Sequence, residues 1–143
     1  MTPPSPPPEK LGIARYAPRA WWPPVLDLIC IATFILVGAG QHRISDGASW
    51  FFTVLWPLAV GWYVVAALTR LYAASERVGL RLVITWAVGT LLASVLRGTF
   101  TDRPMFSVFT AIFMAWIVLT AFGWRGVARA LTLRQQRRRF TKK

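Results

Sequence analysis

The chain has few of the residues from which metal and cofactor sites are usually built. Its 143 residues include one cysteine and one histidine, and only five residues are acidic. A single cysteine excludes an internal disulfide and a thiolate metal cluster within one copy of the chain. One histidine with scattered aspartates has no ligand spacing for zinc, iron or haem. We therefore expect no metal and no cofactor.

Motifs of nucleophilic catalysis are also missing. The sequence has no serine on a strand-to-helix elbow and no cysteine–histidine pair, and its one histidine, His42, follows directly on an apolar run. We therefore expect that the chain is not an enzyme.

The composition is that of a membrane protein. Hydrophobic residues make up 55% of the chain and charged residues 15%, and the charges gather between and beyond long apolar runs. The formal net charge of +12 would suit a nucleic-acid-binding protein only with a basic face on a soluble fold or a recognisable reading module. Because arginines in cytoplasmic loops next to anionic lipids explain the charge, we expect membrane lipids as partners and no nucleic acid.

Four apolar runs predict an all-α fold, a polytopic four-transmembrane-helix bundle within residues 21–129. With their flanking aromatic and arginine residues, the runs approach the roughly 20 residues that cross a hydrocarbon core of about 30 Å. Residues 1–20 are rich in proline and predict a disordered tail, and residues 130–143 form a basic tail. The predicted helices cover about 25–40, 50–71, 82–96 and 106–124.

The distribution of positive residues predicts the orientation of the helices. Fourteen lysines and arginines lie in the two tails and between the second and third runs, and three lie on the other side. The excess places both termini in the cytoplasm, with the chain in the inner membrane. A cleavable signal peptide ending near Gly38–Gly40 is an alternative, but Asp27 interrupts its apolar core, and cleavage would leave basic loops on the wrong side.

Asp27 is the one carboxylate inside an apolar run. An ionisable residue in a membrane helix is costly unless it faces the bundle interior or water, so it is a functional candidate. Arg125 and Arg81 are expected at a similar depth, and pairing with either would make Asp27 structural. We favour pairing and leave open a role in binding a proton or a substrate.

A second polar group is predicted at the opposite side of the membrane. His42 follows the first helix, Arg97 ends the third, and Asp102 lies just beyond it. Because both helices end on that side, these residues form a candidate cluster at the mouth of the bundle.

Small residues indicate where helices approach one another closely. These are Gly61 in the second run, Gly89 and Ala93 in the third, and Ala111 and Ala115 in the fourth. We expect these positions to serve packing.

Short motifs distributed over the four runs resemble those of a known family. They are Asp27, GQH at 40–42, WP at 56–57, Trp86, LRG at 96–98 and GWR at 123–125. The pattern is similar to DUF3054, a family of small bacterial and archaeal membrane proteins common in actinobacteria. The resemblance covers about residues 25–129 and implies four helices, a membrane location and no known activity. The absence of asparagine and the preference for arginine over lysine also suit a GC-rich, actinobacterial genome.

These features lead to one main functional hypothesis and two alternatives. The main hypothesis is a non-catalytic accessory or scaffold subunit that works as a homo-oligomer or with another membrane protein. The first alternative is an oligomeric small-solute or proton-coupled transporter or channel, with a pathway lined by Asp27, Thr85, Thr90 and Arg97. The second is an enzyme or redox carrier acting on a lipid-soluble substrate near His42 and Arg97. A direct contact between Asp27 and a cation favours the main hypothesis.

Overall fold

The computed structural model describes residues 21–41, 47–73, 77–101 and 104–140. The described chain is all-α, which confirms the predicted four-helix bundle. The predicted tail 1–20 and two candidate residues, His42 and Asp102, lie outside the described residues. The elements are α1 (Trp22–Gln41), α2 (Gly47–Leu68), α3 (Val78–Thr101), and a long fourth helix made of α4 (Val108–Ile117), the π-helical turn η1 (Val118–Phe122) and α5 (Gly123–Phe140).

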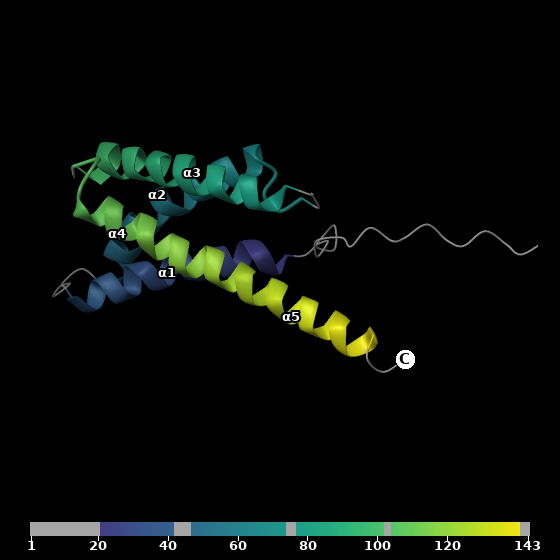
Figure 1. Ribbon diagram of the computed structural model, residues 1–143. Coiled ribbons are helices and arrows are strands. Elements are labelled where there is room, and N and C mark those ends of the chain that lie inside the picture. Colours follow the sequence, from purple (N-terminus) through teal and green to yellow (C-terminus); the bar gives the residue numbers. More distant parts are fainter. Residues whose placement is uncertain (1–20, 42–46, 74–76, 102–103, 141–143) are drawn as a thin grey trace, which may run out of the picture.

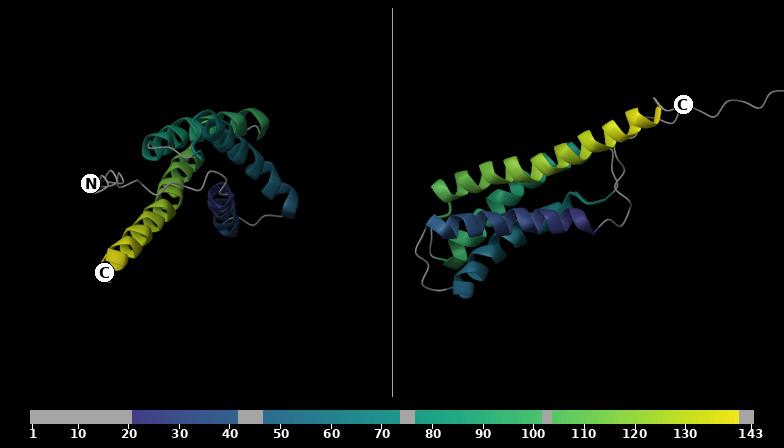
Figure 2. Two further views of the ribbon diagram at one scale, coloured as in Figure 1. Left: turned by 90° about the vertical axis from the view of Figure 1, so that its right-hand side faces the viewer. Right: turned by 90° about the horizontal axis from the view of Figure 1, so that it is seen from below.

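The four long helices run alternately up and down (Figure 1). The most extensive contact is between α2 and α3, while α1 packs on α2, on α4 and on η1, and α3 packs on α4. These contacts close a ring of four helices. The start of α1, the turn between α2 and α3, and α5 lie at the same end, and α5 projects beyond the bundle (Figure 2).

The third and fourth helices extend furthest beyond the predicted ranges, whereas the second begins at Gly47 and ends at Leu68, before its predicted end at residue 71. The third helix runs from Val78 to Thr101, whereas the prediction ended it before Arg97. The guanidinium of Arg97 lies 3.9 Å from the centre of the Phe109 ring. This cation–π contact accommodates the charge, so the helix continues past Arg97. The fourth helix continues from the predicted end at Trp124 to Phe140, so the first part of the predicted basic tail is helical.

All four helices are long and apolar enough to cross a membrane. Their outward faces are as hydrophobic as their inward ones: Leu36 is 58% exposed, Leu91 44% and Leu119 73%. The helices of a soluble bundle carry polar residues on that side, and a helix that is hydrophobic all round belongs to a large core or to a membrane. The chain is therefore a multi-pass membrane protein.

Hydroxyl groups on the helices donate hydrogen bonds to backbone carbonyls, as is expected of a protein inside a membrane. Thr53 donates to the carbonyl of Ser49 even though its side chain is exposed, and Ser94 donates to the carbonyl of Thr90. In hydrocarbon no water is available, so a hydroxyl without a partner is costly. Among the described residues, no buried side-chain nitrogen or oxygen lacks a hydrogen-bond partner.

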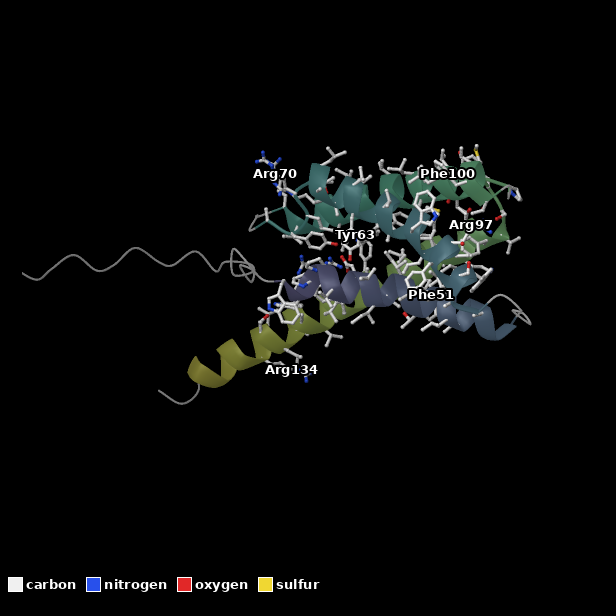
Figure 3. All side chains as sticks on the ribbon, turned by 180° about the vertical axis from the view of Figure 1, so that it is seen from behind. Phe51, Tyr63, Arg70, Arg97, Phe100 and Arg134 are labelled. Atoms are coloured by element: carbon white, nitrogen blue, oxygen red, sulfur yellow. The ribbon has the colours of Figure 1, made fainter. Side chains whose placement is uncertain are left out.

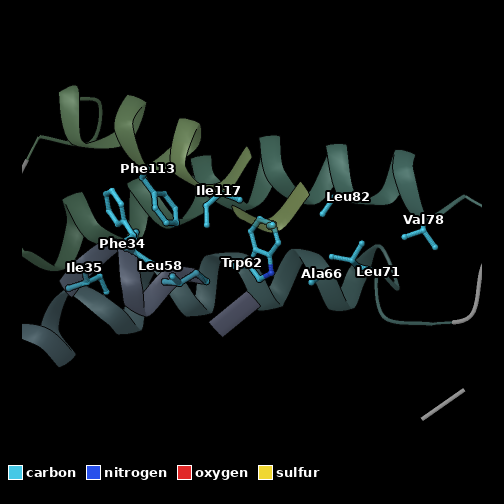
Figure 4. Packing of buried hydrophobic residues seen from close by; sticks show 13 residues of the cluster. Phe34, Ile35, Leu58, Trp62, Ala66, Leu71, Val78, Leu82, Phe113 and Ile117 are labelled. Carbon is cyan, nitrogen blue, oxygen red and sulfur yellow. The ribbon is translucent and has the colours of Figure 1, made fainter. Parts of the chain in front are cut away.

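The centre of the bundle is filled by Trp62 of α2, which is 1% exposed. The same hydrophobic cluster contains residues of the other helices, as Figure 4 shows: Phe34 and Ile35 of α1, Leu82 of α3, and Phe113 and Ile117 of α4. The buried hydroxyl groups of Thr90 and Ser94 also lie in the interior, and each donates to a carbonyl of its own helix.

The helices α2 and α3 approach each other closely at two small residues. A Cβ atom added to Gly61 would stand 2.5 Å from the backbone nitrogen of Ala93 and 2.6 Å from its Cα atom. Gly61, Gly89 and Ala93 were each predicted to lie at a close helix contact, and the structure shows that they meet one another. Ala111 and Ala115, also expected at a helix contact, are exposed on α4, so no other helix of the described chain covers them.

The end of α2 is shaped by a residue with a positive φ angle. Arg70 has φ 52°, its N–H donates to the carbonyl of Ala67 at 3.0 Å, and the N–H of Leu71 donates to the carbonyl of Ala66 at 2.8 Å. This is a Schellman cap, which closes a helix with its last carbonyls paired. Leu71 is 2% exposed, so the cap turns the chain inward and delivers Tyr72 to the bundle interior.

Candidate functional site

Asp27 is buried near the start of α1, with 1% of its surface exposed. The helix begins at Trp22 and passes through Pro23 and Pro24, residues that suit a first helical turn because it needs no donor there. The hydroxyl of Tyr63 in α2 donates to the carbonyl of Pro24. This bond joins the first turn of α1 to α2, three residues before Asp27.

Arg125 of α5 binds the carboxylate with both of its terminal nitrogens. Nη1 lies 2.7 Å from Oδ1 and Nη2 lies 2.7 Å from Oδ2, and Arg125 is 4% exposed. A parallel, two-pronged pair of this kind is the strongest arrangement of an arginine and a carboxylate. The negative and positive charges therefore neutralise each other away from solvent.

Two more donors complete the coordination of the carboxylate. The indole Nε1 of Trp124 donates to Oδ1 at 3.1 Å, and the hydroxyl of Tyr72 donates to Oδ2 at 2.8 Å. Burial, together with the negative charge of Asp27, raises the pKa of the Tyr72 phenol, so the hydroxyl stays protonated and keeps donating. Each oxygen thus accepts two hydrogen bonds, and the four bonds come from α5 and from the turn between α2 and α3.

Further contacts hold these donors in place. Nε1 of Trp62 donates to the hydroxyl of Tyr72 at 3.0 Å, so Tyr72 accepts one bond while it donates another. The guanidinium of Arg125 lies 4.2 Å from the centre of the Trp124 ring, and Nη1 also donates to the carbonyl of Ala121 at 3.0 Å. Trp124 in turn packs edge-on against Trp22, with ring centres 5.3 Å apart.

The π-helical turn keeps Arg125 on the inner face of the fourth helix. Phe113, Ile117, Ala121 and Arg125 follow at intervals of four residues and are all buried. In a regular α-helix each such interval would shift the side chain by about 40° around the axis, or about 120° over three intervals. A π turn takes in one residue more than an α turn. This resets the register, and Arg125 faces Asp27.

Tryptophan side chains join the helices elsewhere in the bundle in the same manner. Nε1 of Trp86 in α3 donates to the carbonyl of Met114 in α4 at 3.0 Å. Nε1 of Trp116 in α4 donates to the carbonyl of Cys30 in α1 at 2.9 Å. Hydrogen bonds between helices can stabilise a bundle inside a membrane, where hydrophobic burial drives association little. The Asp27 site is the most highly bonded of these links among the described residues.

The structure brings together part of the predicted site residues. Asp27 meets Arg125, one of its two expected partners, whereas Nη1 of the other, Arg81, donates to the carbonyl of Arg70 at 2.8 Å. Arg97 lies over Phe109 at the opposite end, and its expected neighbours His42 and Asp102 are outside the described residues. Thr85, expected to line a pathway, is fully buried and shares a hydrogen bond with Thr69 at 2.8 Å.

Tyr72, Trp124 and Trp62 are the members of the site that the sequence reasoning missed. A usable signal was present, because a buried tyrosine or tryptophan usually needs a partner for its O–H or N–H group. The described residues contain no group of three or more histidine, cysteine, aspartate or glutamate side chains that could hold a metal ion.

Replacing Tyr72 by phenylalanine tests the coordination of the carboxylate. Tyr72→Phe leaves both Nε1 of Trp62 and one bonding position of Asp27 without a partner, and we expect a loss of about 1–3 kcal/mol in the free energy of unfolding. Tyr63→Phe, the matched control, removes a bond to a carbonyl and should cost about 1 kcal/mol or less. Unfolding by sodium dodecyl sulfate in mixed micelles, followed by circular dichroism, measures both; equal losses would show that the Tyr72 bond has no special weight.

Residues 24–128 match a family model with the description "Protein of unknown function (DUF3054)". No curated protein and no solved structure matches the chain. The match spans α1 to the first turns of α5, and it contains every residue of the Asp27 site except Trp22.

Proposed function

The chain belongs to the DUF3054 family, and from the geometry of the Asp27 site we propose that it is a non-catalytic accessory or scaffold subunit of a membrane assembly. The observation that carries the proposal is the direct, two-pronged contact between Asp27 and Arg125. Their pairing ties the first helix to the fourth, which suits a bundle that keeps one shape.

The chemistry of the carboxylate supports a structural role. A carboxylate that binds a proton or a substrate in a transporter needs a path to water and a position free for the ligand. Asp27 is 1% exposed, and its two oxygens already accept bonds from Arg125, Trp124 and Tyr72. The contact with a cation is the feature that favours the scaffold over the transporter.

The outward faces of the helices supply the surfaces for assembly. The exposed residues of α4 and η1 include Val108, Ile112 and Leu119, with Ala111 and Ala115 between them. Small residues on a lipid-facing helix allow a second helix to approach closely. A second copy of the chain or another membrane protein is therefore the proposed partner.

We further propose that the chain lies in the inner membrane with both termini in the cytoplasm. In the described part of the chain, Arg97 is at one end and the other arginines are at or near the opposite one, and Figure 3 shows Arg70 and Arg134 far from Arg97. Positive residues remain preferentially on the cytoplasmic side of a bacterial membrane. Cysteine labelling from the two sides of intact cells, at introduced Arg134→Cys and Phe100→Cys, tests this orientation.

Native mass spectrometry of the chain purified in a mild detergent tests the proposed role. We expect a defined oligomer or a stoichiometric membrane-protein companion. The matched variant Ala111→Leu fills the close-approach face of α4 and should weaken the assembly, whereas Val83→Leu on the exposed face of α3 should leave it intact. A monomer without any companion, both in detergent and after crosslinking in membranes, would overturn the proposal.

A further inference from the structure

The charged residues of helix α5 are all positive. Its 18 residues include six arginines and no acidic residue. Arg129 and Arg134 are exposed, in contrast to the buried Arg125. Beyond Arg125 the helix leaves the bundle (Figure 2).

The fourth helix is longer than a membrane requires. It runs over 33 residues from Val108 to Phe140, which corresponds to about 50 Å, whereas the hydrocarbon core is about 30 Å thick. About 20 residues cross that core, so the part of the helix counted from Val108 leaves it just before Arg129, within a candidate membrane span of Val108–Arg134. The arginines that follow therefore begin at the level of the lipid headgroups.

Apolar and basic residues share the same sides of α5. Val127, Leu131 and Leu133 are 60%, 53% and 57% exposed. At about 100° per residue, Val127, Leu131 and Arg134 fall within about 60° of one another around the axis. A helix of this kind suits the headgroup region of a membrane, where acyl chains and phosphate groups lie at the same depth. A purely polar surface would leave its apolar residues without contacts.

Other exposed groups stand at the same end of the bundle. Trp21 is 75% exposed and Trp22 37%, and Arg70 is exposed on the turn between α2 and α3. Tryptophan is typical of the membrane interface, where its ring contacts acyl ends and its N–H contacts headgroups. We call Trp21, Trp22, Arg70, Arg129 and Arg134 the basic collar.

We propose that the basic collar binds anionic phospholipids, with the guanidinium groups of α5 on the headgroup phosphates. Arginine binds phosphate through two parallel hydrogen bonds, and positive residues next to a membrane helix are attracted to an anionic leaflet. The arginines of α5 beyond the paired Arg125 repel those of a second copy, which disfavours pairing of two α5 helices. A soluble acidic protein would satisfy the arginines but not Trp21, Leu131 or Leu133. The inference is independent of the proposed scaffold role.

Lipid binding to the full chain in detergent tests the proposal. Phosphatidylglycerol and phosphatidylcholine with the same acyl chains are added separately, and bound lipid is counted by native mass spectrometry over a range of concentrations. We expect phosphatidylglycerol to bind preferentially. The double variant Arg129→Gln/Arg134→Gln should bind it about 25-fold more weakly, since each arginine near an anionic surface contributes roughly fivefold.

Two controls separate charge, lipid and fold. Arg129→Lys/Arg134→Lys keeps the charge and should retain most of the binding, and circular dichroism verifies the helix content of each variant. Soluble glycerol phosphate should not compete, because the collar requires acyl chains as well. Equal binding of the two lipids, unchanged binding by the glutamine variant, or preference for a polyglutamate peptide over phosphatidylglycerol would overturn the proposal.

Discussion

Replacing Asp27 by alanine is expected to lower the free energy of unfolding by about 3–5 kcal/mol, because the change leaves a buried arginine without its counter-charge. Arg125 is 4% exposed, so its charge would be left away from solvent. Nε1 of Trp124 and the hydroxyl of Tyr72 also lose an acceptor. Unfolding in mixed micelles, followed by circular dichroism, measures the loss.

Removing both charges separates a structural pair from a functional carboxylate. The apolar double variant Asp27→Leu/Arg125→Met should recover at least half of the lost stability, since replacing a whole buried pair by hydrophobic residues is often neutral. On the proposed role, the double variant should also keep the oligomer or the companion protein. A stable double variant that no longer assembles or functions in cells would instead assign the carboxylate a task beyond holding α1 to α5.

The change Gly61→Ala is expected to cost about 3 kcal/mol, at the upper end of the range for overpacking. The added methyl group would stand 2.5 Å from the backbone nitrogen of Ala93. Backbone atoms of a packed helix cannot move aside as a flexible side chain can. The helices α2 and α3, which form the largest contact of the fold, would have to separate along their length.

Gly38→Ala is the matched control for this prediction. Gly38 lies inside α1, and a Cβ atom there would have nothing within 4 Å. The same substitution should therefore stabilise the chain by up to about 1 kcal/mol, because alanine is the better helix former. Comparable losses at the two positions would show that the contact with Ala93 is not what makes Gly61 costly to replace.

The number and type of the helices could be predicted because a membrane leaves few alternatives. Only closed hydrogen-bonding patterns such as helices span hydrocarbon, so a long apolar run specifies both the element and its approximate length. The ends of the helices were less predictable. Arg97 lies inside α3 and Arg129 inside α5. A charged residue ends the apolar run in the sequence, but the helical backbone can continue beyond it.

The candidate site could be predicted in part. Asp27 was found because a carboxylate in an apolar run needs a partner, and Arg125 because the expected topology places it at the same depth. Tyr72 could not be placed from spacing, since its position depends on the cap at Arg70. The π turn has no simple sequence signal either, and it decides which side of the helix Arg125 faces.

The partners of the buried ion pair are separated by 98 positions in the chain, and this distance sets an order of assembly. During synthesis α1 reaches the membrane long before Arg125 exists, so its carboxylate has to remain near the polar edge of the bilayer. Because Asp27 lies close to the start of α1, its carboxylate can stay at this edge at a small cost in free energy until Arg125 is made. Arg125, in the last helix, supplies the counter-charge. A chain that is truncated before Arg125 therefore keeps an unpaired carboxylate in its first helix.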